Sequence, residues 1–377
     1  MKIAFIGSRG IPARYGGFET FVQEVALGLK KKYGYDILVT SDPEQGAKVD
    51  FVKEWEGIEI RYTKDDKGTK PFAFYNQSAK LVKDADIIYS CGVGGVYTIL
   101  TAGLLNRVFV TNPDGLGYNR AKYNPIKQAA LKSLFWFTAV FSKYVCADSF
   151  GIGEAMKKSF LRKRNVHVIE YGSYPNPYVG KDTPEIADAM QRYGLTPNGY
   201  HLVVARLEPE NNVELIIRGY EESQQKYPLV IIGGLKDTPH VKLLQEIAGP
   251  NVIFLGGVYN GDDLPMIRSQ AIDYLHGHSV GGTNPSLLEA MGSGNLCVCH
   301  DNRFNREVVQ EQNGYFFGSP EELGQQLNEI EDSIGSDALE AKKKGAYQRV
   351  VDYYNWESIV DRYHAYFQDI AQKEKIS

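Results

Sequence analysis

The stretch 276–291, His-Gly-His-Ser-Val-Gly-Gly-Thr-Asn-Pro-Ser-Leu-Leu-Glu-Ala-Met, joins a glycine-rich turn to the start of a helix. Gly282 lets a ligand approach the backbone closely. Thr283 and Asn284 precede the first helical N–H groups, which have no intrahelical partner and carry a partial positive charge, so this turn suits an anion such as a diphosphate. Glu289 lies about one turn further on, where its carboxylate could accept hydrogen bonds from a sugar diol.

The flanking elements are expected to hold this turn in place. Residues 271–275 form an apolar strand pattern before it. Asn284 is a good N-cap and Pro285 suits the first helical position, and the apolar residues after them recur at helical spacing. The pattern predicts a strand, an anion cradle and one placed carboxylate, as in a nucleotide diphosphate site. The alternative is an ordinary strand-loop-helix crossover, which every doubly wound sheet contains.

A second glycine-rich loop follows the first strand at the N-terminus. It carries the basic residues Arg9 and Arg14 and ends with Gly16 and Gly17, before an amphipathic helix expected over about 18–32. Its glycines match neither the dinucleotide fingerprint nor the phosphate loop of nucleotide triphosphatases. Long basic loops of this kind bind anions or close over a ligand. The alternative is a solvated basic loop.

Two aspartates follow predicted strands. In open parallel sheets the ligand binds at the carboxyl ends of the strands, and Asp114 and Asp148 are placed there. Asp114 also lies in a sharp Pro-Asp-Gly turn, and the alternative is that it serves as a turn-former only. Both are candidates to contact a substrate.

The segment 125–144 reads as a helix that combines aromatic and basic residues. Trp136 is one of its aromatic residues, Lys127 lies within it, and Lys122 lies just before it. Such a combination suits contact with an anionic membrane surface or a lipid-linked substrate. The alternative is a core helix with a few solvated lysines.

Composition excludes several classes of protein. The chain has 377 residues, 43% hydrophobic and 23% charged, with a net charge of −4, which fits a globular protein and gives no reason to expect a nucleic-acid partner. Its four cysteines lack zinc spacing, and Cys297 and Cys299 are expected to pack as small apolar groups. With no signal-peptide pattern and no run of about 18 apolar residues, a cytoplasmic location is expected.

Strand patterns alternate with helical patterns in two blocks, which predicts an α/β protein with two doubly wound domains. The expected boundaries are 1–175 for the N-terminal domain and 199–352 for the C-terminal domain. The proline-rich stretch 175–198 is expected to be the interdomain linker. Residues 353–377 are expected to form a C-terminal helix that packs back on the N-terminal domain.

Four motifs carry a family resemblance: 7–20, 114–116 followed by Arg120 and Lys122, 205–212, and 281–291. With these motifs the chain resembles the GT-B glycosyltransferases of the large retaining family 4. Within that family it resembles the bacterial rhamnosyltransferase branch of the DUF1972 type, which builds cell-wall and capsular polysaccharide. The resemblance implies two Rossmann-like domains facing a central cleft, the first binding the acceptor and the second the nucleotide-sugar donor.

The family's site residues carry over only in part. Family 4 enzymes usually have Arg-Leu-x-Pro-x-Lys, whose Arg and Lys bind the donor diphosphate; Arg206 matches, but Asn211 stands at the lysine position. They usually have Glu-x7-Glu, whose second Glu holds the ribose; Glu289 matches, but Gly281 stands at the first position. The rhamnosyltransferase branch shares both changes, which implies altered donor recognition.

The resemblance implies transfer of a hexose with retention at the anomeric carbon, from a dTDP- or UDP-sugar, with dTDP-rhamnose favoured. The expected acceptor is a lipid-diphosphate-linked saccharide at the inner membrane face, which implies peripheral membrane contact. Arg206, Arg9 and backbone N–H groups would neutralise the leaving diphosphate, with no metal or other cofactor expected. Asp114 and then Asp148 would contact acceptor or sugar. The rival functions are a nucleotide-sugar epimerase and a non-catalytic nucleotide-sugar-binding subunit.

Overall fold

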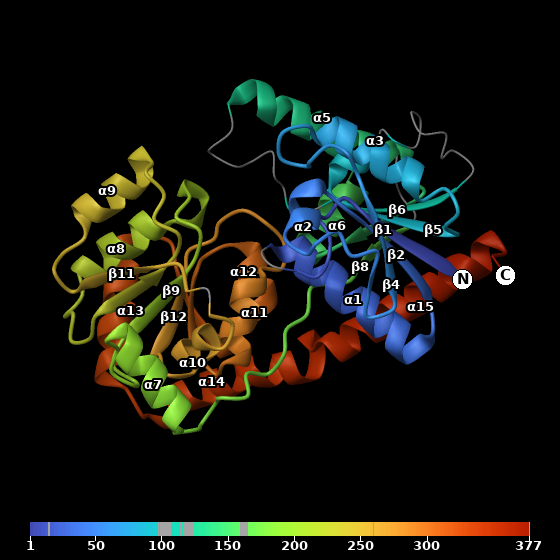
Figure 1. Ribbon diagram of the computed structural model, residues 1–377. Coiled ribbons are helices and arrows are strands. Elements are labelled where there is room, and N and C mark those ends of the chain that lie inside the picture. Colours follow the sequence, from blue (N-terminus) through green and yellow to red (C-terminus); the bar gives the residue numbers. More distant parts are fainter. Residues whose placement is uncertain are drawn as a thin grey trace. The chain divides into compact units, whose positions relative to one another are not determined.

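The structure, a computed structural model, describes residues 1–13, 16–96, 98, 107–113, 115, 124–158, 165–258 and 260–376. These residues form two compact units, each built on its own sheet (Figure 1). The described residues of the first unit fall within 1–172 and 356–376, and those of the second within 173–355. The final helix therefore belongs to the same unit as the N-terminus.

The sheet of the first unit has eight strands in the order β3-β4-β2-β1-β5-β6-β7-β8, and all its pairs are parallel except β3 with β4. Its central strands are almost fully buried, as strands covered on both faces must be. The strands are β1 (Lys2–Ile6), β2 (Asp36–Ser41), β3 (Glu54–Trp55), β4 (Ile58–Tyr62), β5 (Ile87–Cys91), β6 (Val108–Asn112), β7 (Tyr144–Ala147) and β8 (Val166–Val168).

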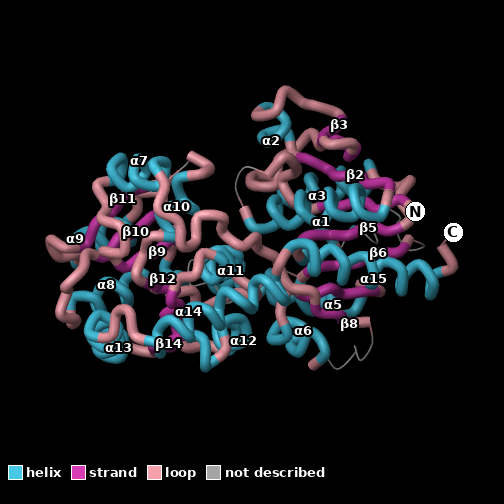
Figure 2. The backbone as a smooth tube through the Cα atoms, turned by 90° about the horizontal axis from the view of Figure 1, so that it is seen from below, coloured by secondary structure: helices cyan, strands magenta, loops and turns pink. Residues whose placement is uncertain are grey.

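The last helix of the chain packs along the first helix in this unit, as Figures 1 and 2 both show. Gly28 permits the close approach, because a Cβ there would lie 2.3 Å from a methyl group of Val360. Lys32 pairs with Asp361 at 2.7 Å. The helices are α1 (Gly17–Tyr33), α2 (Pro43–Ala47), α3 (Pro71–Leu81), α5 (Pro125–Phe141), α6 (Phe150–Lys157) and α15 (Trp356–Glu374), with a short 3-10 turn at Val93–Gly95.

The sheet of the second unit has six parallel strands in the order β11-β10-β9-β12-β13-β14. The strands are β9 (His201–Val204), β10 (Leu229–Ile232), β11 (Val252–Gly256), β12 (Asp273–His276), β13 (Leu296–His300) and β14 (Gly314–Phe317). The helices are α7 (Pro184–Tyr193), α8 (Val213–Glu221), α9 (Pro239–Ile247), α10 (Asp263–Ser269), α11 (Pro285–Gly292), α12 (Arg303–Val309), α13 (Pro320–Asp332) and α14 (Asp337–Arg349). Short turns of other helix types span Pro209–Asn211, Glu311–Asn313 and Val350–Tyr354.

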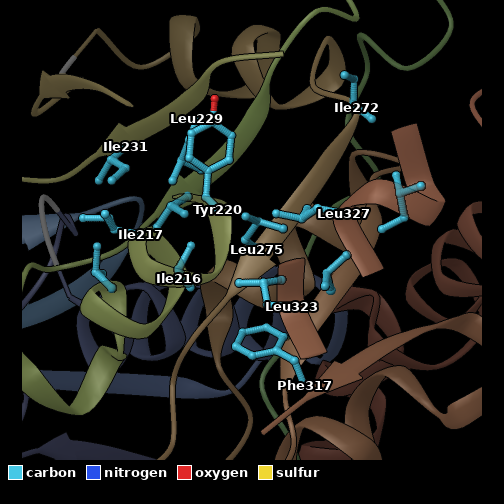
Figure 3. Close-up of a cluster of buried hydrophobic side chains, with 14 of the residues drawn as sticks. Ile216, Ile217, Tyr220, Leu229, Ile231, Ile272, Leu275, Phe317, Leu323 and Leu327 are labelled. Carbon is cyan, nitrogen blue, oxygen red and sulfur yellow. The ribbon is translucent and has the colours of Figure 1, made fainter. Parts of the chain in front are cut away.

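An apolar core of buried side chains holds this second sheet against its helices (Figure 3). Side chains of α8 and α13 pack there onto the strands, and Tyr220 and Phe317 are fully buried within it. Cys297 and Cys299 of β13 are also fully buried, so the expectation that they pack as small apolar groups is confirmed. The predicted α/β class with two doubly wound parallel sheets is likewise confirmed.

Two expectations for local structure are wrong. The supposed linker 175–198 contains helix α7, which belongs to the second unit. Pro184 occupies its first turn, Gly194 ends it in the left-handed conformation, and Ile186 lies on its buried face. Proline therefore marks a helix start here and not a linker. The helix expected over 125–144 ends at Phe141, because β7 begins at Tyr144.

Candidate functional site

The glycine-rich turn of the second unit leads from β12 into α11 as the sequence predicts. Pro285 is the first residue of α11, and the side chain of Asn284 accepts a 2.9 Å hydrogen bond from the backbone N–H of Ser286. Gly281 has a φ of +145°, a conformation that favours glycine, and a Cβ there would meet no atom within 4 Å. Thr283 is 3% exposed. The element prediction for this stretch is confirmed.

Two of the sequence motifs meet at this turn. The side chain of Asn212 donates a 2.8 Å hydrogen bond to the carbonyl of Gly277. Both the backbone N–H and the hydroxyl of Ser279 donate to the carbonyl of Glu210, at 3.1 and 3.0 Å. The segment after β9 and the segment after β12 are thereby fixed to each other.

Helix α12 supplies a third anchor for the turn, which the sequence reasoning missed. The side-chain amides of Asn302 and Asn305 donate to the carbonyl of His278 at 3.0 and 3.1 Å. The side chain of Asn302 also caps α12. A small pocket lies between this helix and the turn, lined by His278, Ser279, Val280, Gly281, Gly282, Asn284, Asn302, Phe304 and Asn305. The sequence signal for this helix was Asn302, a good N-cap residue, with the apolar Phe304 two positions later.

Arg206 lies at the same edge of the sheet. The hydroxyls of Ser286 and Tyr274 donate to the carbonyl of Val204, at 3.2 and 3.0 Å, which joins the end of β9 to the first turn of α11. Arg206 is two residues further on and exposed, and it forms no ion pair with any residue that the structure describes. Asn211, which stands at the family's lysine position, is 2% exposed and donates to the backbone carbonyl of Arg206 at 2.6 Å.

Glu289 carries a partner that the sequence did not indicate. One of its carboxylate oxygens pairs with the guanidinium of Arg268 from α10. The Arg268 side chain is 4% exposed and the Glu289 side chain 48% exposed. A buried cation therefore holds a carboxylate that still faces solvent.

Two imidazoles lie where β12 leads into the turn: His276 is the last residue of β12, and His278 follows two residues later. The rings of His276 and His278 stack with centroids 4.4 Å apart and an interplanar angle of 8°. His276 is 1% exposed, and burial holds its pKa well below the usual range, with nearby His278 acting in the same direction. His276 is therefore a neutral imidazole at neutral pH.

The basic loop of the first unit is held by α1. Glu19, which is buried, accepts a 2.7 Å hydrogen bond from the backbone N–H of Arg9. The Arg9 guanidinium pairs with Glu44 at 2.7 Å in an exposed ion pair. Gly16 has a φ of +123°, and a Cβ there would lie 2.1 Å from a carboxylate oxygen of Glu19. Gly17 begins α1.

The remaining candidates of the first unit fall in different places. Asp148 follows β7 at the carboxyl end of the sheet and is 2% exposed, immediately before the Ser149 cap of α6. Arg14, Asp114 and Lys122 lie outside the residues that the structure describes.

Helix α5 presents an apolar face to solvent. Trp136 and Phe137 are each 42% exposed, and Lys127 is exposed on the same helix. Further exposed apolar side chains on α5 are Ile126, Val140 and Phe141. The sequence of α5 has no acidic residue. A core helix would bury these side chains, so that alternative does not hold for this face.

The described residues contain neither a metal-binding cluster nor a membrane-spanning helix. Across the part of the chain that the structure describes, no cluster of three or more His, Cys, Asp or Glu side chains is placed to hold a metal ion. Over the same residues, no helix has the length and hydropathy needed to cross a membrane.

Family comparisons divide the chain as the two sheets do. Residues 189–349 match the family described as "Glycosyl transferases group 1", and residues 1–174 match the family described as "Domain of unknown function (DUF1972)". Among solved structures, HepE of Anabaena in complex with UDP and glucose is similar, with a TM-score of 0.77 and 18% identity over 98% of this chain and 100% of that one.

The chain has the GT-B fold. Sucrose-phosphate synthase of Thermosynechococcus elongatus is also similar, with a TM-score of 0.79 and 17% identity over 99% of both chains. At these identities the likeness establishes the fold alone. The O-antigen chain mannosyltransferase B of Escherichia coli is 27% identical over 138 residues, 35% of this chain and 36% of that protein. The match thus spans about a third of that curated relative. Together with the family match in the second unit, it supports a GT-B glycosyltransferase.

Proposed function

We propose that the protein is a retaining glycosyltransferase that moves L-rhamnose from dTDP-rhamnose to a hydroxyl of a lipid-diphosphate-linked saccharide in bacterial polysaccharide synthesis. In this proposal the second unit binds the nucleotide-sugar donor and the first unit binds the acceptor. The group 1 family match over 189–349 and the GT-B fold support the reaction class.

One observation supports the proposed donor site. The carbonyl of Val204, two residues before Arg206, accepts hydrogen bonds from Ser286 in the first turn of α11 and from Tyr274 of β12. This anchor brings an exposed cation to the edge of the sheet where α11 begins. Backbone N–H groups near Thr283 and Asn284 and the N-terminal charge of the helix also favour a diphosphate there. Glu289 lies on the same helix and is proposed to accept hydrogen bonds from the nucleotide's ribose.

The chemistry requires the charge that develops on the departing diphosphate to be stabilised. The proposal assigns this task to Arg206 and to the backbone N–H groups of the turn, which are fixed before the reaction starts. It includes no step at a metal ion. The leaving phosphate assists deprotonation of the acceptor on the face from which it departs. Asp114 and Asp148 are proposed to contact the acceptor or the transferred sugar.

The basic loop of the first unit is proposed to bind the donor as well. Its Arg9 already forms an exposed ion pair with Glu44, and such pairs are weak in water, so the guanidinium can exchange that carboxylate for a phosphate. Gly16 and Gly17 keep the backbone accessible where α1 begins, and Arg14 is proposed to act beside them.

Helix α5 is proposed to bring the enzyme to its acceptor at the inner face of the cell membrane. Aromatic side chains such as Trp136 are exposed on the same helix as the exposed Lys127, and the helix carries no acidic residue. Apolar rings insert at the headgroup level, and lysines are attracted by anionic lipids. Lys122, just before this helix, is proposed to contribute in the same way.

The most specific part of the proposal is the identity of the transferred sugar, L-rhamnose. It rests on the resemblance of 7–20 and 281–291 to the rhamnosyltransferase branch and on Gly281 at the family's first glutamate position. The test is a donor panel of dTDP-rhamnose, UDP-glucose, UDP-N-acetylglucosamine and GDP-mannose, each with a lipid-diphosphate-linked sugar. Transfer from dTDP-rhamnose is expected. Transfer from GDP-mannose or a UDP-sugar alone would keep the enzyme class and overturn the sugar.

A further inference from the structure

The side chain of Arg268 is a buried cation with a specific set of partners. It extends from the end of α10, and its side chain is 4% exposed. One terminal nitrogen pairs with Oε2 of Glu289, and the other donates a 2.9 Å hydrogen bond to the hydroxyl of Ser286. Among the described residues, Nε of Arg268 has no hydrogen-bond partner. Glu289 is therefore the anionic partner of a guanidinium that is removed from water.

The pairing with Arg268 uses one carboxylate oxygen of Glu289 and leaves the other able to bind a ligand. Its side chain is 48% exposed, and its other carboxylate oxygen, Oε1, forms no hydrogen bond to a described residue. A carboxylate on an exposed helical position normally samples several rotamers, which costs entropy when a ligand is bound. The pairing with Arg268 fixes one oxygen, so Oε1 is presented in a single direction.

The guanidinium is itself held in place. Ser286, which receives its second hydrogen bond, lies 2.7 Å from the hydroxyl of Tyr274. Both hydroxyls also donate to the carbonyl of Val204 at the end of β9. The Arg268 side chain is thus locked to two positions of α11 and, through Ser286, to the strand that leads to Arg206.

We propose that Arg268 is a positioning residue that orients Glu289 to accept hydrogen bonds from the ribose hydroxyls of the donor nucleotide. The inference rests on the proposed function, because it takes the ligand at α11 to be a nucleotide. In a thymidine nucleotide the hydroxyl concerned is the 3′-hydroxyl. Arg268 acts on the ligand only through Glu289.

The test measures how much the 3′-hydroxyl contributes to binding. Calorimetric titration compares dTDP with 2′,3′-dideoxythymidine diphosphate, on the wild type and on Arg268→Met, Arg268→Lys and Glu289→Gln. The wild type is expected to bind dTDP about tenfold more tightly than the dideoxy nucleotide, because a hydrogen bond to a charged acceptor contributes about that much. The quantity compared among the variants is this ratio of dissociation constants. The ratio is expected to fall towards one in Arg268→Met, and to fall also in Glu289→Gln, whose neutral amide oxygen accepts a weaker hydrogen bond.

A matched control separates positioning from stability. Arg192 pairs with Asp263 at the opposite end of α10, and its side chain is 51% exposed. Arg192→Met removes an ion pair from the same helix without touching Glu289. It is expected to keep the tenfold ratio. Combining Arg268→Met with Glu289→Gln is expected to give the same ratio as Glu289→Gln alone, because both changes remove one interaction.

The outcomes distinguish the inference from the proposed function. A folded Arg268→Met protein that keeps the full ratio would overturn the positioning role. If Arg268→Met does not fold, Arg268→Lys decides. Its single ammonium nitrogen lacks the two planar NH2 groups that the guanidinium gives to Glu289 and Ser286, so it is expected to fix Glu289 less firmly. A ratio unchanged from the wild type would overturn the proposal. If the wild type binds neither nucleotide, the proposed function fails, and the positioning role of Arg268, which rests on it, fails with it.

Discussion

The hydroxyl of Ser286 donates a 3.2 Å hydrogen bond to the carbonyl oxygen of Val204. The two residues are 82 positions apart in the sequence, and this bond ties the first turn of α11 to the end of β9. The residues after β9 include Arg206, and α11 carries Glu289. A cation and a carboxylate from separate motifs are thereby held at one edge of the second sheet.

Arg206→Ala is expected to reduce kcat/KM for sugar transfer by about a hundredfold or more, because it removes the cation that is proposed to stabilise the leaving diphosphate. The measurement is steady-state transfer from the donor. The control is Arg218→Ala on α8, which removes an exposed arginine whose partner, Glu214, lies four residues before it. That pair is worth about 0.5 kcal/mol or less. Equal activity in the two variants would show that Arg206 does not contribute to sugar transfer.

Asn305→Ala is expected to weaken the glycine-rich turn. Its amide donates to the carbonyls of His278 and His300, and the residue is 4% exposed, so its loss leaves buried acceptors with fewer partners. The free energy of unfolding should fall by about 1–3 kcal/mol, and KM for the donor should rise. Urea unfolding and donor kinetics check both. Asn251→Ala, at an exposed position, is the control, and matching values in the two variants would contradict the anchoring role.

His201 gives the second unit a pH-dependent stability. Burial alone would lower its pKa, but Asp273 at 2.8 Å and Glu331 at 3.1 Å raise the pKa of His201 to about 9. Because the folded pKa lies above the unfolded value of about 6.5, the stabilisation is fully present below pH 6.5 and is lost as the pH rises through about 9. The loss should be of the order of 3 kcal/mol.

Urea unfolding of the wild type and of His201→Gln between pH 6 and pH 10 measures this contribution. The wild type should lose stability relative to the variant across that range. Parallel curves would contradict the charged state of His201. If the variant does not fold, the imidazole resonance of His201 in the wild type should titrate near pH 9.

Helix α5 is expected to bind anionic membranes. Replacing both Lys127 and Lys132 by glutamate should weaken binding to vesicles of phosphatidylglycerol and phosphatidylcholine by about tenfold or more, since each lysine near the surface contributes about 1 kcal/mol. Flotation measures the bound fraction. The same charge change at Lys236 and Lys344, which are exposed in the second unit, is the control. Equal loss in both double variants would point to overall charge and away from α5.

Local sequence signals correctly predicted the helix and strand that form the proposed donor site. Asn284 and Pro285 mark the start of α11, and the structure places both in those roles. The same kind of signal marks α7, where Pro184 starts a helix and Gly194 ends it, but the density of prolines nearby suggested a linker. Helix α7 could therefore have been predicted from the sequence.

Other features of the site could not be predicted. Arg268 lies 21 residues before Glu289, and nothing in either local pattern indicates that α10 returns to α11. The contacts of Asn302 and Asn305 with the carbonyl of His278 likewise depend on the order of β12 and β13 in the sheet. Tertiary packing fixes these contacts, so a sequence pattern of period 2 or 3.6 does not contain them.

The central claim is transfer of a sugar to an acceptor, and its most direct test is nucleoside diphosphate release from dTDP-rhamnose with and without a lipid-diphosphate-linked saccharide. The account predicts release that depends on the acceptor and matches the glycosylated product in amount. Conversion of the donor without acceptor would point to an epimerase. Nucleotide binding with no turnover in either condition would contradict the account and favour a non-catalytic binding subunit.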